Sequence, residues 1–211
     1  MRILVAAFAA SLTAAVAVPA FAIDGTADAP DAAAPPSRET ATDAPPADVA
    51  RSEQLDQLFQ ELKAAPDDDT ARSVESSIQA VWIQSGSATV DLLMSWTVDA
   101  MQAKNYPVAL DYLDRIVTMK PDYVEGWNKR ATVYFLTDDY ARSLSDLEHV
   151  LALEPRHFVA LAGLGTILRD LGEDEKALQA YQEALALDPR LDKVDKAVQE
   201  LTASGVGGRS L

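Results

Sequence analysis

The sequence predicts an all-α fold in which helical hairpins stack in series as an α-solenoid. Pro121, Pro155 and Pro189 stand 34 residues apart, and a fixed period of roughly 20–50 residues is typical of stacked repeats. The residues before each proline repeat in one register at helical spacing. These columns are Ala109, Ser143 and Ala177; Leu113, Leu147 and Tyr181; Ile116, Val150 and Ala184; and Met119, Leu153 and Leu187. We therefore expect about three hairpins, at residues 89–122, 123–156 and 157–190.

The first 22 residues show the three-part pattern of a secretory signal peptide. Arg2 supplies a positive start, an apolar run follows, and Ala20-Phe21-Ala22 forms an Ala-x-Ala cleavage pattern. An uncleaved membrane anchor is the less favoured alternative, because the apolar run is shorter than the ~20 residues that span a bilayer. We expect cleavage after Ala22, no later membrane insertion and a periplasmic location in a Gram-negative bacterium.

Residues 23–50 are rich in Ala, Pro and Asp and contain few bulky apolar side chains. Such a segment buries too little apolar surface to offset its ordering entropy, so a disordered tether is expected. A pro-peptide is the alternative. Residues 204–211, which include Gly205, Gly207 and Gly208, predict a flexible tail.

A divergent helical hairpin is predicted at residues 51–86, before the repeats. Its two apolar faces consist of Leu55, Leu58, Phe59 and Leu62, and of Val74, Ile78, Val81 and Trp82. Asp67 and its acidic neighbours predict a turn and a helix cap between them. Pro66 lies one period plus 21 residues before Pro121, so this hairpin is out of phase with the repeats. A capping helix at 191–203, with Leu191 and Leu201 on its apolar face, is predicted at the other end.

Within each repeat, the first helix has its own columns of apolar and small residues. They are Leu93, Trp127 and Leu161; Thr97, Ala131 and Gly165; and Ala100, Tyr134 and Leu168. Asn105, Asp138 and Asp174 are expected to cap the second helices. Asp122 and Glu125 have the spacing of a capping box for the first helix of the second hairpin.

The most specific residues lie in the second and third hairpins. They are Trp127, Ala131, Tyr134, Tyr140, Leu147 and Pro155, then Leu164, Gly165, Gly172, Ala177, Tyr181, Ala184 and Pro189. On these residues, 89–189 resembles the tetratricopeptide repeat (TPR) family, and the leader suggests an exported bacterial type. Arg130, Ser143 and Asp174 depart from the family pattern, which has an apolar residue, an alanine and an aromatic residue there.

The resemblance implies a groove formed by the first helices, outside their packing columns, which binds a peptide or protein. The matching positions are Met94, Val98, Met101, Glu125, Asn128, Thr132, Phe135, Ala162, Thr166 and Arg169. The alternative is that some of these side chains pack against the N-terminal hairpin. The Lys and Asn set by which chaperone-binding members hold a terminal carboxylate is not matched. Arg130 is expected to stack on an aromatic ring or to pair with an acid such as Glu125 or Asp99.

The composition and motifs argue against several other functions. A net charge of −15 argues against nucleic acid and against an anionic membrane surface as partners. His149 and His157 lack the converging ligands of a zinc site, and no serine has a nucleophile-elbow signature. We therefore expect no enzyme activity, no metal and no cofactor.

The leading interpretation is an exported, non-enzymatic scaffold or adaptor for a protein or peptide partner, for example in envelope assembly. The alternatives are a structural self-association module that forms homo-oligomers, and an accessory subunit of an envelope enzyme.

Overall fold

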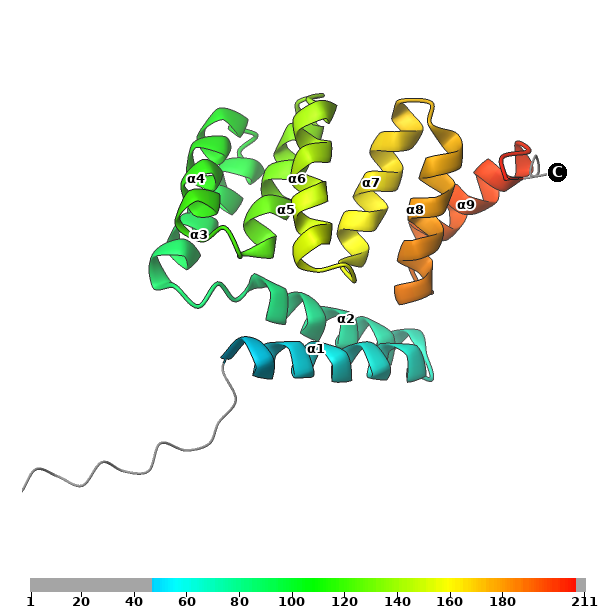
Figure 1. Cartoon of the computed structure of the whole chain (residues 1–211), viewed down its shortest axis with the longest axis horizontal. Helices are drawn as coiled ribbons and strands as arrows, with labels where there is room; N and C mark the ends of the chain where they lie inside the picture. The colour runs from blue at the N-terminus through cyan, green and yellow to red at the C-terminus, as the bar shows by residue number, and fades with distance from the viewer. Residues whose placement is uncertain (1–46, 208–211) are drawn as a thin grey trace, which may run out of the picture. The chain divides into compact units, whose positions relative to one another are not determined.

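The structure is a computed structural model that describes residues 47–207, with side chains from residue 49 onward. This range holds nine α-helices and no strand (Figure 1). The helices are α1 (Ala47–Ala64), α2 (Asp68–Ile83), α3 (Ala88–Gln102), α4 (Tyr106–Met119), α5 (Val124–Leu136), α6 (Tyr140–Leu153), α7 (Phe158–Asp170), α8 (Asp174–Leu187) and α9 (Asp192–Ala203). The signal peptide at 1–22, the tether up to residue 46 and the tail from residue 208 are predictions outside the described residues. The helix α1 includes residues 47–50, which the sequence analysis assigned to the tether.

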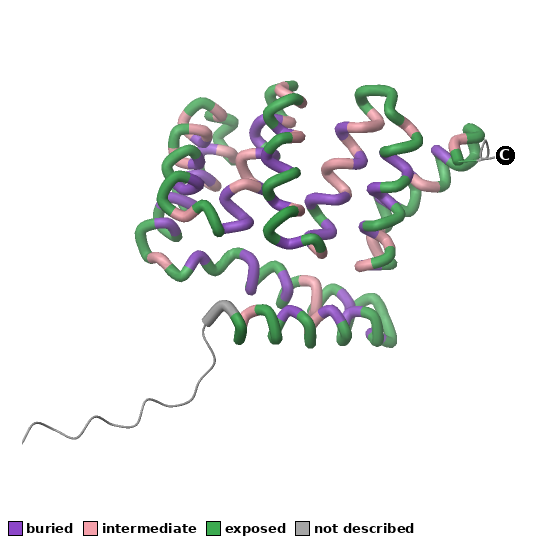
Figure 2. Tube along the Cα trace, in the orientation of Figure 1, coloured by how far each residue is buried: buried purple, intermediate pink, exposed green. Residues whose placement is uncertain are grey.

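The predicted α-solenoid is confirmed for the described residues. The pairs α3–α4, α5–α6 and α7–α8 form the repeated hairpins, α4 packs on α5, α6 packs on α7, and α9 packs on α8. Purple buried segments in Figure 2 recur along these helices, as expected when each helix turns one face to its neighbours. The small column Ala109, Ser143 and Ala177 is buried, with at most 1% of each residue exposed. The Ser143 hydroxyl is satisfied because it donates to the carbonyl oxygen of Ala131 at 2.8 Å.

Gly165 allows α7 and α8 to approach closely, as its column predicted. A Cβ atom placed on Gly165 would lie 2.6 Å from two ring carbons of Tyr181, which is itself buried. Gly163, two residues earlier in the same helix, has open space around the corresponding position. The two glycines therefore form a matched pair, one required by packing and one not.

Substituting each glycine by alanine should change stability in opposite directions. Gly165→Ala should destabilise the protein by about 1–3 kcal/mol, because the tightly packed Tyr181 ring must shift. Gly163→Ala should stabilise it by up to about 1 kcal/mol, because alanine is the better helix former. Urea unfolding followed by circular dichroism would measure both. Equal effects of the same sign would contradict this packing.

Several predicted helix caps differ from those in the structure. The side chain of Asn105 makes no capping hydrogen bond. Asp139, not Asp138, caps α6 by accepting from the backbone N–H of Arg142 at 3.2 Å. Asp138 instead lies in the left-handed region, at φ +59°, in the turn before the cap. Asp174 is the first residue of α8, where its charge favours the helix dipole without a capping bond.

The predicted capping box of α5 is also absent. The residue before the helix is Tyr123, whose side chain makes no capping bond, and Glu125 is buried in another network described below. In contrast, Asp67 caps α2 as predicted by accepting from the backbone N–H of Thr70 at 2.7 Å.

The N-terminal hairpin α1–α2 lies across the turns that join successive repeats, at one end of their helices (Figure 1). The residue two positions after each repeated proline contacts this hairpin. The Tyr123 hydroxyl donates to the carbonyl oxygen of Ile83 at 2.8 Å. The His157 ring stacks on Trp82 with centroids 4.1 Å apart, and Leu191 packs against the hairpin core.

Arginines at the preceding register position add polar contacts to the hairpin. Arg156 pairs with Asp56 of α1, and its guanidinium lies 4.9 Å from the centre of the Phe59 ring. Arg190 donates to Asp68 at 3.1 Å and to the carbonyl oxygen of Ala65 at 2.7 Å. The hairpin is therefore held at two successive repeat junctions by equivalent arginines.

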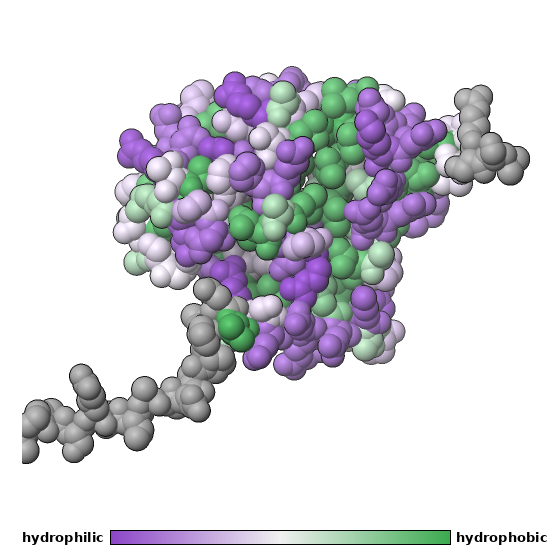
Figure 3. All heavy atoms as spheres, viewed as in Figure 1, coloured by the Kyte–Doolittle hydropathy of each residue, from purple (hydrophilic) through white to green (hydrophobic). Residues whose placement is uncertain are grey.

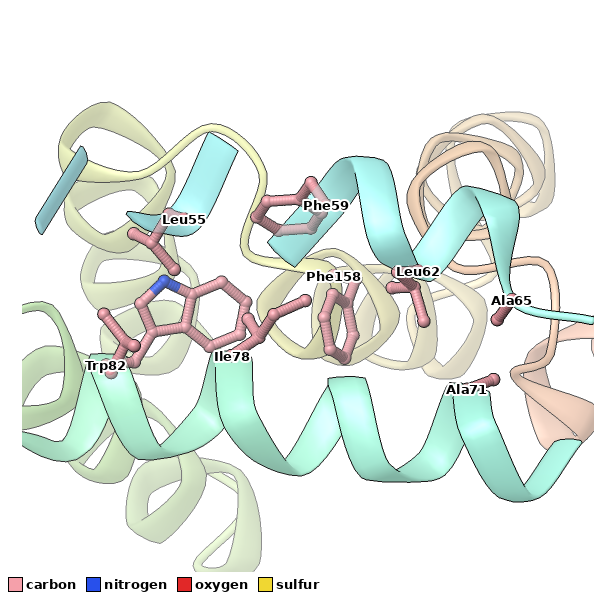
Figure 4. Packing of buried hydrophobic residues seen from close by; sticks show 9 residues of the cluster. Leu55, Phe59, Leu62, Ala65, Ala71, Ile78, Trp82 and Phe158 are labelled. Atoms are coloured by element: carbon pink, nitrogen blue, oxygen red, sulfur yellow. The ribbon is translucent and has the colours of Figure 1, made fainter. Parts of the chain in front are cut away.

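The hairpin shares a hydrophobic core with the start of α7 (Figure 4). Leu55, Phe59 and Leu62 project from α1, Ile78 and Trp82 project from α2, and Phe158 enters from the third repeat. Phe158 and Trp82 are each 1% exposed, with ring centroids 5.3 Å apart. Burial of this area stabilises the docked hairpin, since each large apolar side chain contributes ~1.5–3 kcal/mol when buried.

Candidate functional site

A cleft of about 960 Å³, called here the main cleft, lies between α2, α7 and α9. One wall is the first helix of the third repeat, which the TPR resemblance assigns to a groove. The hairpin helix α2 and the α8–α9 turn supply the other walls. The lining residues are Asp68, Arg72, Glu75, Val159, Ala162, Gly163, Thr166, Arg169, Tyr181, Pro189, Arg190, Leu191, Asp192, Lys193, Val194, Lys196, Ala197 and Glu200.

Charged groups of both signs surround the apolar floor of the main cleft. The three arginines that line it are engaged within the chain: Arg190 with Asp68 at 3.1 Å, Arg169 with Glu200 at 3.5 Å, and Arg72 with Asp69. Lys193 and Lys196 of α9 form no ion pair with any described residue, so their ammonium groups are available to a ligand. A site of this kind suits an extended polypeptide, whose backbone and side chains need apolar contact as well as hydrogen-bond partners.

A second, smaller cleft of about 190 Å³ lies between α5, α6 and α7. Its lining residues are Asn128, Ala131, Thr132, Phe135, Ser143, Leu147, Val159, Gly163, Thr166 and Ile167. Val159, Gly163 and Thr166 also line the main cleft, so the two cavities adjoin along α7. Figure 3 shows hydrophobic residues gathered over α6 and α7 between more hydrophilic regions. Apolar contact therefore continues beyond the main cleft toward the second repeat.

The predicted groove residues fall into three groups in the structure. Asn128, Thr132 and Phe135 line the small cleft, and Arg169, with Ala162 and Thr166, lines the main cleft. Met94 and Glu125 are buried, at 5% and 7% exposure. Val98 is partly exposed and Met101 packs against the core of the first repeat. The structure thus brings together Asn128, Thr132 and Phe135 with the predicted residues of the third repeat, and leaves out Glu125 and the residues of the first repeat.

The main cleft also contains residues that the sequence analysis did not assign to a site. Arg72 and Glu75 come from α2, and Lys193 and Lys196 come from α9. Their positions depend on contacts between segments more than 100 residues apart, such as Arg190 with Asp68, which local patterns do not reveal. The sequence contains one sign of these contacts: Arg156 and Arg190 each directly follow a repeated proline.

Glu75, which lines the main cleft, lies beside the carboxyl group of Asp188. Asp188 is fully buried, and its Oδ2 atom has no hydrogen-bond partner among the described residues. Burial raises the pKa of Glu75, and the neighbouring Asp188 carboxylate raises it further. Burial likewise raises the pKa of Asp188. A shared proton between these groups would relieve their repulsion, as in other close carboxyl pairs.

Glu125 is a structural residue that joins the second repeat to the third. His157 caps α7 by accepting from the backbone N–H of Ala160 at its Nδ1 atom, at 3.1 Å. The neutral ring then carries its proton on Nε2, which donates to Glu125 at 3.4 Å. Asn128 donates to the other carboxylate oxygen at 3.0 Å. Burial raises the pKa of Glu125, but the bond from His157, the charge of Lys129 and the bond from Asn128 outweigh it and lower the pKa to about 2.

This lowered pKa predicts how the stability contributed by Glu125 depends on pH. The pKa of Glu125 is about 2 in the folded chain, whereas the ordinary value for a glutamate is 4.5. The ionised carboxylate therefore stabilises the fold above pH ~4.5. That contribution is lost as the pH falls toward ~2. Glu125→Gln should therefore lower the free energy of unfolding by on the order of 2–3 kcal/mol at pH 7. Wild type and variant should converge toward pH 2 in urea unfolding. A difference that does not vary with pH would contradict the assignment, and Glu148→Gln, at an exposed site, is the control.

Arg130 is accounted for by packing and ion pairs. Its partners are Asp146, which accepts from Nε and Nη2 at 2.8 Å each, and Asp114, which accepts from Nη1 at 2.7 Å. They are not Glu125 or Asp99, the acids suggested by the sequence. The guanidinium also lies 4.8 Å from the centre of the Trp127 ring, so the expected aromatic contact is present.

Two further properties concern the described residues only. No helix between residues 47 and 207 is long and apolar enough to cross a membrane. In the same range, no three His, Cys, Asp or Glu side chains are grouped so that they could hold a metal ion.

Comparison with known proteins decides the family. Residues 99–162 and 158–191 match the tetratricopeptide repeat. A TPR repeat-containing protein of Rhizobium etli is 44% identical over 158 residues, which cover 75% of this chain and 78% of that protein. The chain belongs to the tetratricopeptide repeat family. Hsp70-Hsp90 organizing protein 3 of Arabidopsis thaliana is 27% identical over 108 residues, but these cover 49% of this chain and only 19% of that protein.

Solved TPR structures share the fold. The first TPR of Spaghetti, bound to the HSP90 peptide SRMEEVD, has a TM-score of 0.53 at 20% identity and covers 55% of this chain and 91% of that one. The TPR2B domain of yeast Sti1 in its pHsp70 complex has a TM-score of 0.52 at 14% identity and covers 56% and 99%. MamA has a TM-score of 0.52 at 16% identity and covers 75% and 80%. The first of these neighbours thus holds a peptide of another protein, and the second is in a complex with pHsp70.

Proposed function

We propose that this TPR protein is an exported, non-enzymatic adaptor that binds an extended segment of a partner protein in the main cleft. The observation that carries the proposal is the cleft of about 960 Å³, which combines apolar residues with two lysines that form no ion pair with a described residue. Its volume lies at the upper end of the ~300–1,000 Å³ typical of binding pockets. The HSP90 peptide bound to one structural neighbour and the pHsp70 complex of another support a polypeptide as the class of ligand.

The proposal includes export to the periplasm, where the partner would belong to an envelope assembly. Its support is the leader pattern that ends in Ala20-Phe21-Ala22. Mass spectrometry of the protein released by osmotic shock should find a chain that begins at Ile23. A chain that retains Met1 and stays with the membrane would overturn this part and leave the cleft proposal untouched.

The charge of the chain supports a protein as the partner. At a net charge of −15, the surface repels both nucleic acid and anionic lipid, whose binding requires basic faces. We propose no catalytic residue, metal or cofactor, since the cleft residues have a sufficient role in polypeptide binding.

A bulky residue in the cleft tests the proposal without assuming the charge of the ligand. Partners are first captured from an envelope extract with the full exported chain and identified by mass spectrometry. Gly163→Trp places an indole where both clefts meet and where a Cβ atom meets no neighbour. The variant should lose the captured partner.

The matched control is Ala186→Trp, at an exposed position of α8 outside both clefts. This control should keep the partner. Equal capture by wild type, Gly163→Trp and Ala186→Trp would overturn binding in the main cleft.

A further inference from the structure

The two repeat junctions that hold the N-terminal hairpin differ in how their acidic residue is neutralised. Glu154 and Asp188 each directly precede a repeated proline, and both are buried. Glu154 accepts from the backbone N–H of Arg156 at 3.0 Å and from its Nε and Nη2 atoms at 2.9 and 3.2 Å. Asp188 accepts from the backbone N–H of Arg190 at 3.1 Å, but the Arg190 guanidinium donates to the hairpin instead. Asp188 therefore lacks the charged hydrogen-bond partner that Glu154 has.

A second carboxyl group lies where that partner is missing. Glu75 of α2 is within hydrogen-bond reach of Asp188, which directly follows α8. The two residues, called here the carboxyl pair, meet across the contact between the hairpin and the third repeat. Asp188 is 0% exposed, and no described residue donates to its Oδ2 atom. A buried oxygen of this kind needs a donor, and a proton held between the two carboxyl groups would supply it.

Charged groups from four elements line the main cleft together with Glu75. They are Asp68 and Arg72 of α2, Arg169 of α7, Arg190 of the α8–α9 turn, and Asp192, Lys193, Lys196 and Glu200 of α9. The charges of Arg72 and Arg190 lower the pKa of Glu75, but both arginines are already paired with acids of the hairpin. Burial and the neighbouring Asp188 carboxylate outweigh them, so the pKa of Glu75 is raised above its ordinary 4.5. Burial also raises the pKa of Asp188 above 3.8.

Docking of the hairpin is therefore linked to proton uptake. When α2 leaves the third repeat, both carboxyl groups return to water and regain their ordinary pKa values. At a pH between the ordinary and the raised values, the docked state holds a proton that the undocked state has released. Stability falls with rising pH wherever the folded state binds more protons. A rise in pH through this window favours undocking, whereas at lower pH both states are protonated and docking does not change.

We propose that Glu75 and Asp188 form an acid-dependent latch, which holds the N-terminal hairpin on the third repeat and loosens as the pH rises. The apolar core around Phe158 also contributes to docking, so the latch adjusts how often the hairpin opens. Because α2 supplies Arg72 and Glu75 to the main cleft, opening takes away one wall of that cleft. Acid should then favour ligand binding, a consequence that rests on the proposed function, whereas the latch itself does not.

Hydrogen exchange of the α2 amides tests the latch in the full chain from Ile23, without any ligand. An undocked helix of 16 residues is marginal in water, so exchange reports opening of the hairpin. After correction for the intrinsic exchange rate, the opening constant of wild type should rise above pH ~4.5 by up to about tenfold per pH unit, the slope for release of one proton, and then level off.

Two variants and a control assign this slope to the carboxyl pair. Glu75→Gln should remove it and keep α2 protected at high pH, because the glutamine amide donates to Asp188 without titrating. Asp188→Asn, on the other side of the contact, should remove it independently. Glu53→Gln, at an exposed position of α1, should exchange as wild type does.

Three results would overturn the proposal. The first is a corrected opening constant of wild type that does not change with pH. The second is a wild-type slope retained by Glu75→Gln and Asp188→Asn while circular dichroism shows both variants folded. The third is a Glu75 carboxyl whose carbon-13 chemical shift titrates at the ordinary pKa of 4.5. None of these measurements involves a ligand, so the latch can fail while binding in the main cleft stands, and the reverse.

Discussion

Replacing Trp82 by Ala should lower the free energy of unfolding by about 3–5 kcal/mol, the usual cost of truncating a buried tryptophan. Trp82 is 1% exposed and lies at the centre of the contact between the N-terminal hairpin and the third repeat. It touches Phe59 and Phe158 and stacks on His157. Its Nε1–H has no hydrogen-bond partner among the described residues, so the loss would come from packing alone.

The effect should extend beyond the cavity itself. His157 caps α7 and donates to Glu125, and the Trp82 ring is its stacking partner. Removing that ring should loosen the junction of the second and third repeats. Ile83→Ala is the matched control, because Ile83 is 50% exposed and should change stability by less than ~0.5 kcal/mol. Urea unfolding by circular dichroism measures both, and equal losses would contradict the docking of α2 on α7.

Arg130→Leu should destabilise the protein by about 3–5 kcal/mol, because it strands the Asp146 carboxylate without its partner. The side chains of Arg130 and Asp146 are 16% and 5% exposed. The third repeat shows what could replace the pair, since Leu164 and Ala180 occupy the corresponding positions. The double variant Arg130→Leu with Asp146→Ala would copy that apolar pair into the second repeat.

The double variant should recover most of the stability that Arg130→Leu loses, since no charge is then left buried and unpaired. Thermal unfolding of wild type, both single variants and the double variant completes the cycle. If the losses of stability in the two single variants add up in the double variant, the broken ion pair is not what destabilises Arg130→Leu. Partner capture should be unchanged throughout, because neither Arg130 nor Asp146 lines the clefts.

The repeated hairpins could be predicted because each one shows the same local pattern three times. Columns such as Ala109, Ser143 and Ala177 specify a packing contact that depends on neighbouring helices only. Gly165 was assigned correctly for the same reason, since its partner Tyr181 is sixteen residues away in the same hairpin.

The position of the N-terminal hairpin could not be predicted in this way. Its apolar faces were visible in the sequence, but they fit any apolar surface of sufficient size. Its location depends on pairs such as Asp56 with Arg156, which are 100 residues apart. The partners of Arg130 were missed for a related reason. They lie on α4 and α6, each sixteen residues from Arg130, whereas Glu125 and Asp99, the acids suggested by the sequence, lie on the first helices of their repeats.

The position of the N-terminal hairpin also determines which residues form the candidate site. A terminal hairpin stacked on the end of the array would have covered the first repeat and left the groove to the repeats alone. Instead, α2 supplies Arg72 and Glu75 to a wall of the main cleft. Ligand binding in that cleft should therefore also stabilise the docked hairpin, because only the docked state has the complete site.

Site-specific photo-crosslinking tests the central claim, binding of a partner in the main cleft, most directly. A photo-reactive amino acid at Val159, which is 42% exposed and lines both clefts, is compared with one at Leu153, which is 45% exposed and lines neither. We expect the Val159 probe to crosslink the partner identified by affinity capture and the Leu153 probe to leave it unmodified. Crosslinks of equal yield from both positions, or from Leu153 alone, would contradict the account.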